Sequence, residues 1–445
     1  MSRSALRVIL CVFAVIILTL VAIGAIAWWK MAKLKEELVQ GLGKSIGAQV
    51  QVASLDLDLW RGELNAAGIS LTNDRPSAPW EKGAISQATI RFNLVDIFSP
   101  TLPLSVDVSS WTIVLTPNTA SASTETPSAL TSARTITSVE TATPTQARVQ
   151  VTQLSAHDGS VEIDLADNHQ IVLSGVAFVA NDNSAGTWTT ELQANSVKAG
   201  SLEAGPSSVQ LRTTQDKADF SNLRLTCGPG VITGEGEVTL DGAHDIKATL
   251  KAAEVPIIML VGVEWQMKLA GQVTGDMTYD SNDQGGSAKG QISLNHAKFN
   301  ILPWLGKVTA LVSLPDITDV EVDKATSDFT WNAGKLELSN IDIRKNDVAR
   351  ISGMADIDPT GMVDARLKLG LPSTIIAKWP QLQDKIFSVQ LEDYNWADVH
   401  LTGPPDHLQE DLSPRLLTVS MQQGGSLLDQ ATQKANDLWK SLMGK

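Results

Sequence analysis

The sequence predicts a mostly β protein with a transmembrane helix near its N-terminus, antiparallel sheet over most of its length, few helices and a C-terminal amphipathic helix. Three observations lead to this prediction. No charged residue lies between Arg7 and Lys30. Most of the following chain alternates apolar and polar residues with a period of two, as half-buried strands do. The final residues return to the apolar spacing of a helix.

The apolar segment 8–29 is long enough to cross a bilayer as a helix. At about 1.5 Å per residue it extends about 33 Å, against a hydrocarbon core of about 30 Å. Two tryptophans followed by lysines suit a membrane interface. A cleaved signal peptide ending near residues 25–27 is the alternative, although its apolar core is usually shorter. We expect residues 1–45 to form an anchor and a juxtamembrane helix, with these residues in the span: Val8, Phe13, Leu18, Ile23, Trp28 and Trp29.

The chain is acidic, with a formal net charge of −14. Residues 1–30 hold three basic residues and no acidic one, so the rest carries 32 basic and 49 acidic residues. Such a body is a poor nucleic-acid binder, because phosphate contacts need clustered Lys and Arg. Cys227 is the one cysteine outside the apolar segment, so we expect no disulfide within the body.

Short period-two runs separated by turn residues predict strands along the body. The first run begins at Val50 and Val52, and its phase slips before Leu55, Leu57 and Leu59. Further runs are Val161/Ile163/Leu165, Val209/Leu211, Ile246/Ala248/Leu250, Val308/Ala310/Val312/Leu314 and Val363/Ala365/Leu367/Leu369. Turns are expected at Asp158-Gly159, at Asp241-Gly242 and, as type I, at Asp358-Pro359-Thr360-Gly361. Because each run leaves one polar face, we expect antiparallel sheet.

Residues 117–148 interrupt this pattern with a stretch rich in Ser, Thr, Pro and Ala. The stretch lacks aromatic residues and the apolar density that would offset the entropy of ordering. We predict a disordered insertion that separates an N-terminal strand module, residues 46–116, from a β-sheet body, residues 149–410.

Two passages of the body resemble each other at a distance of about 118 residues. Each has a Ser-Asn pair within an apolar alternation, then a strand with a central glycine, then a further strand that leads to a proline. The first copy is residues 221–225 and 232–238 with Pro256, and the second is residues 339–343 and 351–357 with Pro372. Chance similarity between hairpins and a repeated meander both remain open.

The tail, residues 411–445, is expected to be a linker followed by an amphipathic helix. After Gly424-Gly425, apolar residues recur at helical spacing. One alternative is a helix docked on its own sheet. The other is a helix that contacts a membrane or a partner protein through these residues: Leu427, Leu428, Ala431, Leu438, Trp439 and Leu442.

No motif predicts catalysis, a cofactor or a metal site. Residues 43–47 match G-x-S-x-G, but a nucleophile elbow needs a strand before the serine and a helix after it, and the expected order is the reverse. The six histidines never approach one another at metal-ligand spacing. Asp56 and Asp58 share one strand face, which we interpret as a solvated polar face. We therefore expect a protein that is not an enzyme.

Four stretches share a family pattern. Residues 46–52 lead into the first strand through small residues and a glycine, and residues 59–73 form a strand pair that ends in an asparagine. Residues 151–163 give a strand containing Asp-Gly, and residues 399–408 end a strand in Thr-Gly before prolines. Over about residues 5–410 the chain resembles the AsmA-like family, including its C-terminal module.

The resemblance implies a single-pass protein of the bacterial inner membrane with its body in the periplasm. In that family an elongated, curved β-sheet is thought to present an apolar groove for phospholipid. We therefore expect a groove-shaped sheet whose apolar face binds acyl chains, in lipid transport, outer-membrane biogenesis or envelope maintenance. The alternative is a structural or assembly factor that binds another envelope protein through a sheet edge or the C-terminal helix.

Overall fold

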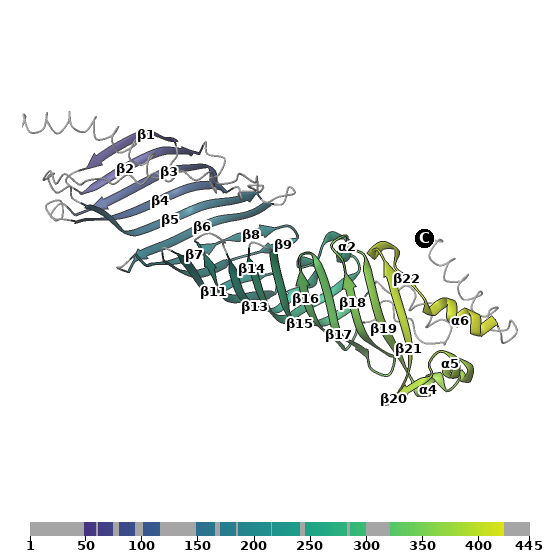
Figure 1. Ribbon diagram of the computed structural model, residues 1–445. Coiled ribbons are helices and arrows are strands. Elements are labelled where there is room, and N and C mark those ends of the chain that lie inside the picture. The colour runs from purple at the N-terminus through teal and green to yellow at the C-terminus, as the bar shows by residue number, and fades with distance from the viewer. Residues whose placement is uncertain are drawn as a thin grey trace, which may run out of the picture. The chain divides into compact units, whose positions relative to one another are not determined.

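The computed structural model describes residues 49–58, 61–73, 80–93, 101–115, 148–164, 170–183, 186–214, 216–240, 245–282, 285–299 and 321–421 (Figure 1). They belong to two compact units, Met1–Asn181 (unit 1) and Asp182–Lys445 (unit 2), which we describe separately. Within these residues no helix combines the length and apolarity that a membrane span needs. The predicted anchor, the run 308–314 and the tail beyond Met421 lie outside the described residues, as does the predicted insertion up to Arg148.

Unit 1 is a six-stranded sheet whose strands lie in chain order. Its strands are β1 (Gln49–Asp58), β2 (Glu63–Thr72), β3 (Trp80–Phe92), β4 (Thr101–Leu115), β5 (Arg148–Asp164) and β6 (Gln170–Asp182). The phase slip predicted in the first strand is confirmed by burial: Val52 and Leu55 are both half-buried, and the two residues between them, Ala53 and Ser54, are both exposed. Opposite the slip, Gly68 has a φ of +61°, and a Cβ there would lie 2.9 Å from that of Ala53.

One pair of strands in unit 1 departs from the antiparallel expectation. β4 and β5 run parallel, from Thr101 opposite Arg148 to Leu115 opposite Ile163. Parallel neighbours need a crossover of a dozen or more residues, and the Ser/Thr/Pro-rich segment between Leu115 and Arg148 supplies it. The segment therefore joins two strands of one sheet. The compact units divide after Asn181, whereas the sequence pattern placed the boundary at 117–148.

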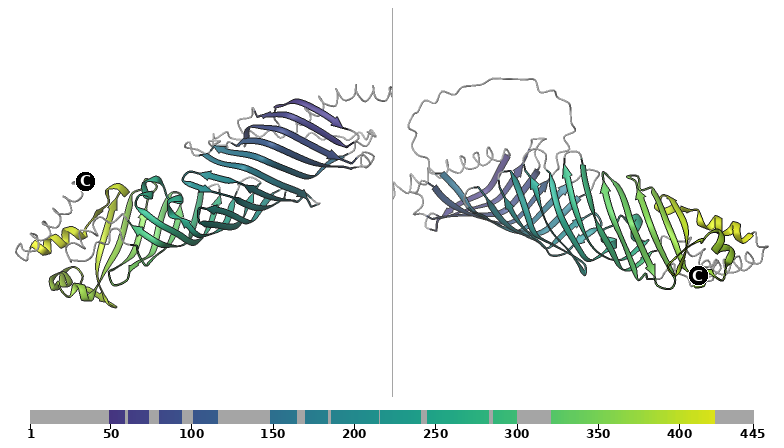
Figure 2. Two further views of the ribbon diagram at one scale, coloured as in Figure 1. Left: turned by 180° about the vertical axis from the view of Figure 1, so that it is seen from behind. Right: turned by 60° about the horizontal axis from the view of Figure 1, so that its bottom comes forward.

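Unit 2 is a long antiparallel sheet (Figure 2). Its strands are β7 (Trp188–Ala194), β8 (Ser196–Ala199), β9 (Leu202–Ala204), β10 (Ser207–Thr213), β11 (Lys217–Cys227), β12 (Gly230–Thr239), β13 (Ile246–Pro256), β14 (Leu269–Asn282), β15 (Gly285–Phe299), β16 (Lys324–Asn332), β17 (Lys335–Lys345), β18 (Ala349–Ile357), β19 (Val363–Pro372), β20 (Val389–Leu391), β21 (Tyr394–Gly403) and β22 (Gln409–Glu410). β7 pairs with β10, and the strands from β10 through β19 form a series in which consecutive strands pair. β19 then pairs with β21, which also pairs with β20 and β22.

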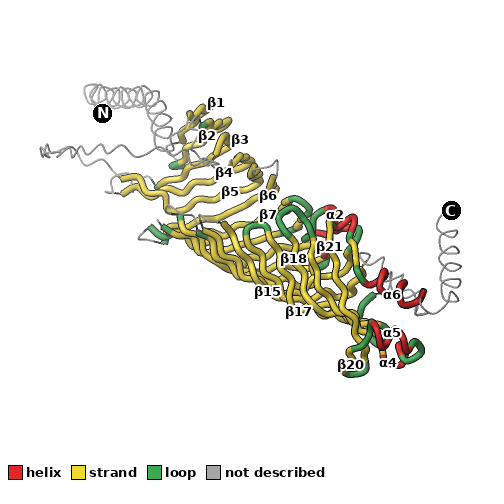
Figure 3. Tube along the Cα trace, turned by 45° about the vertical axis from the view of Figure 1, so that its right-hand side comes forward, coloured by secondary structure: helices red, strands yellow, loops and turns green. Residues whose placement is uncertain are grey.

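Short helices interrupt this sheet. They are η3 (Ile257–Met259), α2 (Val263–Gln266), α4 (Ser373–Ile376), α5 (Pro380–Lys385), η4 (Pro405–His407) and α6 (Leu412–Met421). Figure 3 shows α4, α5 and α6 gathered beside β20 at the C-terminal end of unit 2, with α2 apart from them. The structure thus confirms a mostly β, largely antiparallel fold with few helices.

The strand register gives unit 2 one apolar face and one polar face. Directly paired residues share a face. One row across β14 to β19 and β21 reads Met277, Gly290, Phe329, Leu338, Ala355, Ala365 and Leu401. The adjacent row, on the other face, reads Thr278, Lys289, Thr330, Glu337, Asp356, Asp364 and Thr402. The predicted alternation is therefore the basis of the whole sheet.

Bulges with left-handed backbone recur along both sheets. In unit 2 they lie at Asn222, Glu254, His296 and Asn340, where φ is +52°, +55°, +53° and +52°. Asp158, with a φ of +54°, is a further example in β5. The turn predicted at Asp158-Gly159 is therefore wrong: the residues lie inside a strand, where an αL-tolerant aspartate makes a bulge rather than a reversal. The turn predicted at Asp358 is confirmed, with Gly361 N–H donating to the Asp358 carbonyl at 2.9 Å.

The two similar passages fold alike. Asn222 donates to the Gln210 side chain at 2.8 Å, and Asn340 donates to Asp328 at 2.6 Å, each twelve residues upstream. Both copies continue through two further strands to a proline with nearly the same backbone angles, and a short helix follows it. The repeated unit is therefore β10–β13 with η3, and β16–β19 with α4.

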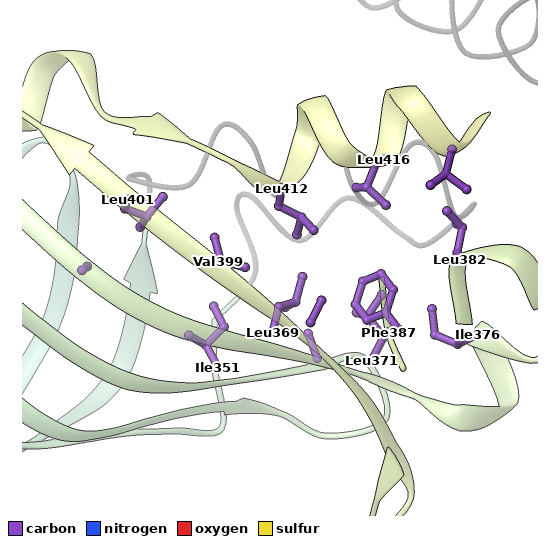
Figure 4. Close-up of a cluster of buried hydrophobic side chains, with 14 of the residues drawn as sticks. Ile351, Leu369, Leu371, Ile376, Leu382, Phe387, Val399, Leu401, Leu412 and Leu416 are labelled. Carbon is purple, nitrogen blue, oxygen red and sulfur yellow. The ribbon is translucent and has the colours of Figure 1, made fainter. Parts of the chain in front are cut away.

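A large buried cluster, the C-terminal core, closes one end of the apolar face of unit 2. Figure 4 shows Leu412 and Leu416 of α6 facing Leu369, Leu371 and Phe387. All five side chains are at most 1% exposed. The helix α6 lies in the stretch that the sequence assigned to a linker, and it docks on its own sheet because its buried residues follow helical spacing.

Replacing Phe387 with alanine should destabilise unit 2 by about 3–5 kcal/mol, because removing a fully buried ring leaves a cavity in the C-terminal core. Pulse proteolysis of the full chain in detergent, across a urea series, measures the change. Leu391→Ala is the matched control, since Leu391 is 61% exposed and its loss should leave the midpoint nearly unchanged. Equal midpoints for the two variants would contradict the role of the C-terminal core.

Candidate functional site

An apolar cavity of about 480 Å³ opens on the apolar face of unit 2. It lies between residues 257–269, here called the roof segment, and the strands β15 to β18. Its lining is Ile257, Leu260, Val261, Gly262, Trp265, Leu269, Ile292, Leu294, Ala325, Thr326, Ser327, Leu336, Leu338, Ile341, Ile343 and Ile357. The volume falls within the range of small-molecule sites, and none of these residues is charged.

The bulge in β17 shapes the floor of the cavity. Leu338 and Ile341 are three residues apart, so regular alternation would place them on opposite faces. The register instead shifts between them, at the left-handed Asn340, and both side chains line the cavity. Because of this bulge, β17 supplies more apolar lining residues than any other strand. They are Leu336, Leu338, Ile341 and Ile343.

Hydrogen bonds fix the roof segment in place. The Ser201 hydroxyl, in the turn between β8 and β9, lies 3.3 Å from the Met259 carbonyl and 3.2 Å from the Val261 carbonyl. The Gln266 side chain donates to the Ile258 carbonyl at 3.1 Å. These bonds satisfy backbone acceptors that a segment outside the ladder would leave to solvent.

Packed side chains bound the cavity on two sides. Trp265 packs against the C-terminal core, together with lining residues of β17 and β18. Met259 packs against a smaller cluster formed by Ala204, Cys227 and Val255. Burial raises the pKa of the Cys227 thiol, as expected for an ionisable group within an apolar cluster. The cavity is therefore an unfilled space between two packed clusters on the same face of the sheet.

The polar groups in the lining are satisfied internally. Ser327 is 8% exposed, and its hydroxyl lies 2.9 Å from the Ser339 carbonyl and 2.8 Å from the Asp328 carbonyl. No lining atom is among the buried polar side-chain atoms that lack a partner in the described residues. The lining thus offers hydrocarbon contact and no group that would demand a polar ligand.

Unit 1 also has one apolar face. A row of paired residues across its strands reads Leu57, Leu64, Ile90, Val106, Leu154 and Ala180. Trp111 packs edge to face on Phe178, with ring centroids 5.9 Å apart. A Cβ at Gly159 would lie 2.1 Å from the Trp111 ring, so the glycine of the bulge makes room for it. Most large apolar side chains on this face are half-buried, and no described helix of unit 1 covers them.

Charges gather on the opposite face of unit 2, where they form paired networks. Lys217 lies 2.8 Å from Asp219 and 2.7 Å from Glu237, and these hydrogen bonds raise its pKa to about 12. Behind the cavity floor, Asp342 contacts Arg344 at 2.8 Å and Lys324 at 2.9 Å. Burial acts to raise the pKa of Asp342, but the hydrogen bonds from Arg344 and Lys324 prevail and lower it to about 2.

None of the candidate site residues singled out in the sequence is among the described residues that line the cavity. The six predicted span residues, the six predicted tail contacts and residues 43–47 lie outside the described residues. Asp56 is exposed, and Asp58 accepts the Arg61 backbone N–H at 3.1 Å. Within the described ranges, no group of three potential ligand side chains is placed to hold a metal ion.

Sequence reasoning missed the roof segment. Its signal is an uncharged run from Val255 to Val263 that follows no period of two. The run is too short for a membrane helix and too irregular for a strand, so only the paired strands β13 and β14 reveal it as an excursion over the apolar face.

Comparison with models of known protein families and with curated proteins finds no match to this chain.

Asp342→Asn should lower the stability of unit 2 at neutral pH by about 1 kcal/mol, a value reduced for partial solvent screening. The folded-state pKa lies below the ordinary 3.8, so the contribution is present above about pH 4 and is lost as pH falls towards 2. Urea midpoints across this range measure it, and the variant should flatten the decline. Asp276→Asn, at an exposed position of β14, is the control. An equal decline in unaltered chain and Asp342→Asn would contradict the assignment.

Proposed function

We propose that this chain is a membrane-anchored, non-enzymatic protein of the bacterial periplasm that binds the acyl chains of phospholipids on its apolar sheet face. Its role would be lipid transport or envelope maintenance. The observation that supports this most directly is the uncharged cavity of about 480 Å³ between the roof segment and β15–β18. The predicted inner-membrane anchor and the resemblance to AsmA-like proteins agree with this proposal.

The chemistry of the lining suits hydrocarbon. Each buried methylene stabilises a bound chain by about 0.8 kcal/mol, and this attraction has no directional requirement. Since the lining offers no unsatisfied polar group, a charged headgroup stays in solvent at the cavity mouth. The site therefore selects for an acyl chain and discriminates little between headgroups.

The half-buried apolar face of unit 1 supports the same proposal. It presents one apolar side chain per strand along each row, without a described helix above it. A row of half-buried apolar side chains that continues across several strands is a candidate interaction site. Acyl chains are suitable occupants for both units, because neither face offers a pattern of charges to a protein partner.

A second candidate function is an assembly factor that binds another envelope protein through a sheet edge. The observation in its favour is β20, a three-residue strand in which Val389 and Leu391 are both 61% exposed. A photo-crosslinking residue at Leu391 that captures one specific protein, and no lipid, would favour this candidate.

Lipid capture from inside the cavity tests the proposed function. We place a photo-crosslinking p-benzoyl-phenylalanine at Leu338, which lines the cavity, and irradiate cells that express the full chain. The matched control is Glu337, the adjacent residue, whose side chain lies on the polar face. We expect phospholipid adducts by mass spectrometry at position 338 and only background at 337.

Two results would count against the proposal. Equal capture at the two positions would mean that lipid binds without regard to the cavity. A folded variant with no lipid adduct at position 338 would leave the cavity without its proposed ligand.

A further inference from the structure

The roof segment exposes several large apolar side chains to solvent. Ten of its residues contain four of the eleven most exposed large apolar side chains in the described chain. They are Ile258 at 47%, Leu260 at 44%, Val263 at 77% and Met267 at 87% exposure. Leu260 also lines the cavity, so the exposed set is continuous with the cavity mouth.

The repeat shows that the fold does not require this exposure. In the second copy, residues 373–386 occupy the same place in the chain, directly after a strand that ends in proline. The exposed residues there are polar or small: Thr374, Ala377, Lys378, Pro380, Gln381, Asp384 and Lys385. The exposed apolar residues are therefore particular to the copy that roofs the cavity.

The exposed residues are presented on a fixed framework. Ser201 holds the roof segment from one side, and Gln266 bonds within it to the Ile258 carbonyl. A surface that is already ordered loses little conformational entropy when it binds.

The composition of the roof segment suits a bilayer surface. Lys268 Nζ lies 5.8 Å from the centre of the Trp265 ring. Tryptophan and lysine both sit at membrane interfaces, with the apolar part of the side chain inwards and the polar tip in water. The segment carries one acidic and one basic residue, Glu264 and Lys268. Binding would therefore depend on apolar insertion rather than on attraction to anionic headgroups.

We propose that residues 258–267 insert shallowly into a phospholipid bilayer and present the cavity mouth to it, so that an acyl chain passes beside Leu260 into the cavity. This proposal rests on the proposed function. Four side chains on ten residues are small against the roughly 800 Å² per partner of a stable protein interface. Shallow insertion into an acyl surface requires only such a short apolar ridge.

Fluorescence quenching tests the insertion. The full chain carries Cys11→Ala and Val263→Cys, labelled with the environment-sensitive dye NBD, while Cys227 stays because it is fully buried. The chain is reconstituted into vesicles of phosphatidylethanolamine and phosphatidylglycerol, with or without a quencher on the acyl chains. We expect blue-shifted emission and quenching at position 263. The matched control, Gln381→Cys in the second repeat, should show neither.

Acidic substitution tests the passage of lipid. Val263→Asp with Met267→Asp changes two exposed side chains, so the fold should persist. We expect lipid capture by the crosslinker at Leu338 to fall about tenfold, since aspartate is strongly disfavoured at acyl depth. Thr374→Asp with Gln381→Asp makes the same charge change at exposed positions of the second repeat and should leave capture unchanged.

The outcomes separate this proposal from the proposed function. Lipid capture at Leu338 together with an unquenched dye at 263, or with full capture in the Val263→Asp/Met267→Asp variant, overturns docking and leaves the lipid cavity standing. A crosslinker at 263 that couples to a second copy of the chain or to another protein, and not to lipid, also overturns docking. No capture at Leu338 even in the unaltered chain defeats the proposed function, and with it the passage of lipid.

Discussion

The structure depends on one constraint: a single-layer sheet with an apolar face must have that face covered. In unit 2 the chain meets the constraint locally. Three helices cover the C-terminal end, and the β8–β9 hairpin contributes to the smaller cluster. Between these two regions the roof segment covers the face without filling the space below it. The cavity therefore lies where side chains of the chain itself do not fill the space between the roof segment and the sheet.

The repeat clarifies why the cavity exists. Both copies end a strand in proline and then leave the ladder for a short helical excursion. In the second copy, Ile376 and Leu382 of this excursion and Phe387, the residue that follows it, are buried in the C-terminal core with α6. The first copy has no counterpart of α6 among the described residues. The same repeated unit thus contributes to a packed core in the second copy and to an apolar cavity in the first.

Much of the fold follows from local pattern, and the remainder depends on partners distant in the chain. The runs at Val209, Ile246 and Val363 become β10, β13 and β19, because alternation fixes both the strand and its buried face. The turn predicted at Asp158-Gly159 was wrong because bulges and turns favour the same residues, those that tolerate the αL conformation. The parallel pairing of β4 with β5 and the cavity lining both bring together residues that are far apart in sequence. The pattern of a short stretch of sequence cannot predict such contacts.

The parallel pair in unit 1 also bears on how the chain folds. Nearly every other pairing joins strands that follow one another closely in the chain. β4 and β5 are farther apart, since Val106 pairs with Leu154, 48 residues further along the chain. Loop closure of this kind is slow to achieve, so β5 and β6 should join the first four strands late. Its entropic cost grows only slowly, by about 0.6 kcal/mol for each doubling of loop length. The connection can therefore lengthen or shorten over generations with little effect on stability, while the ladder on either side stays in register.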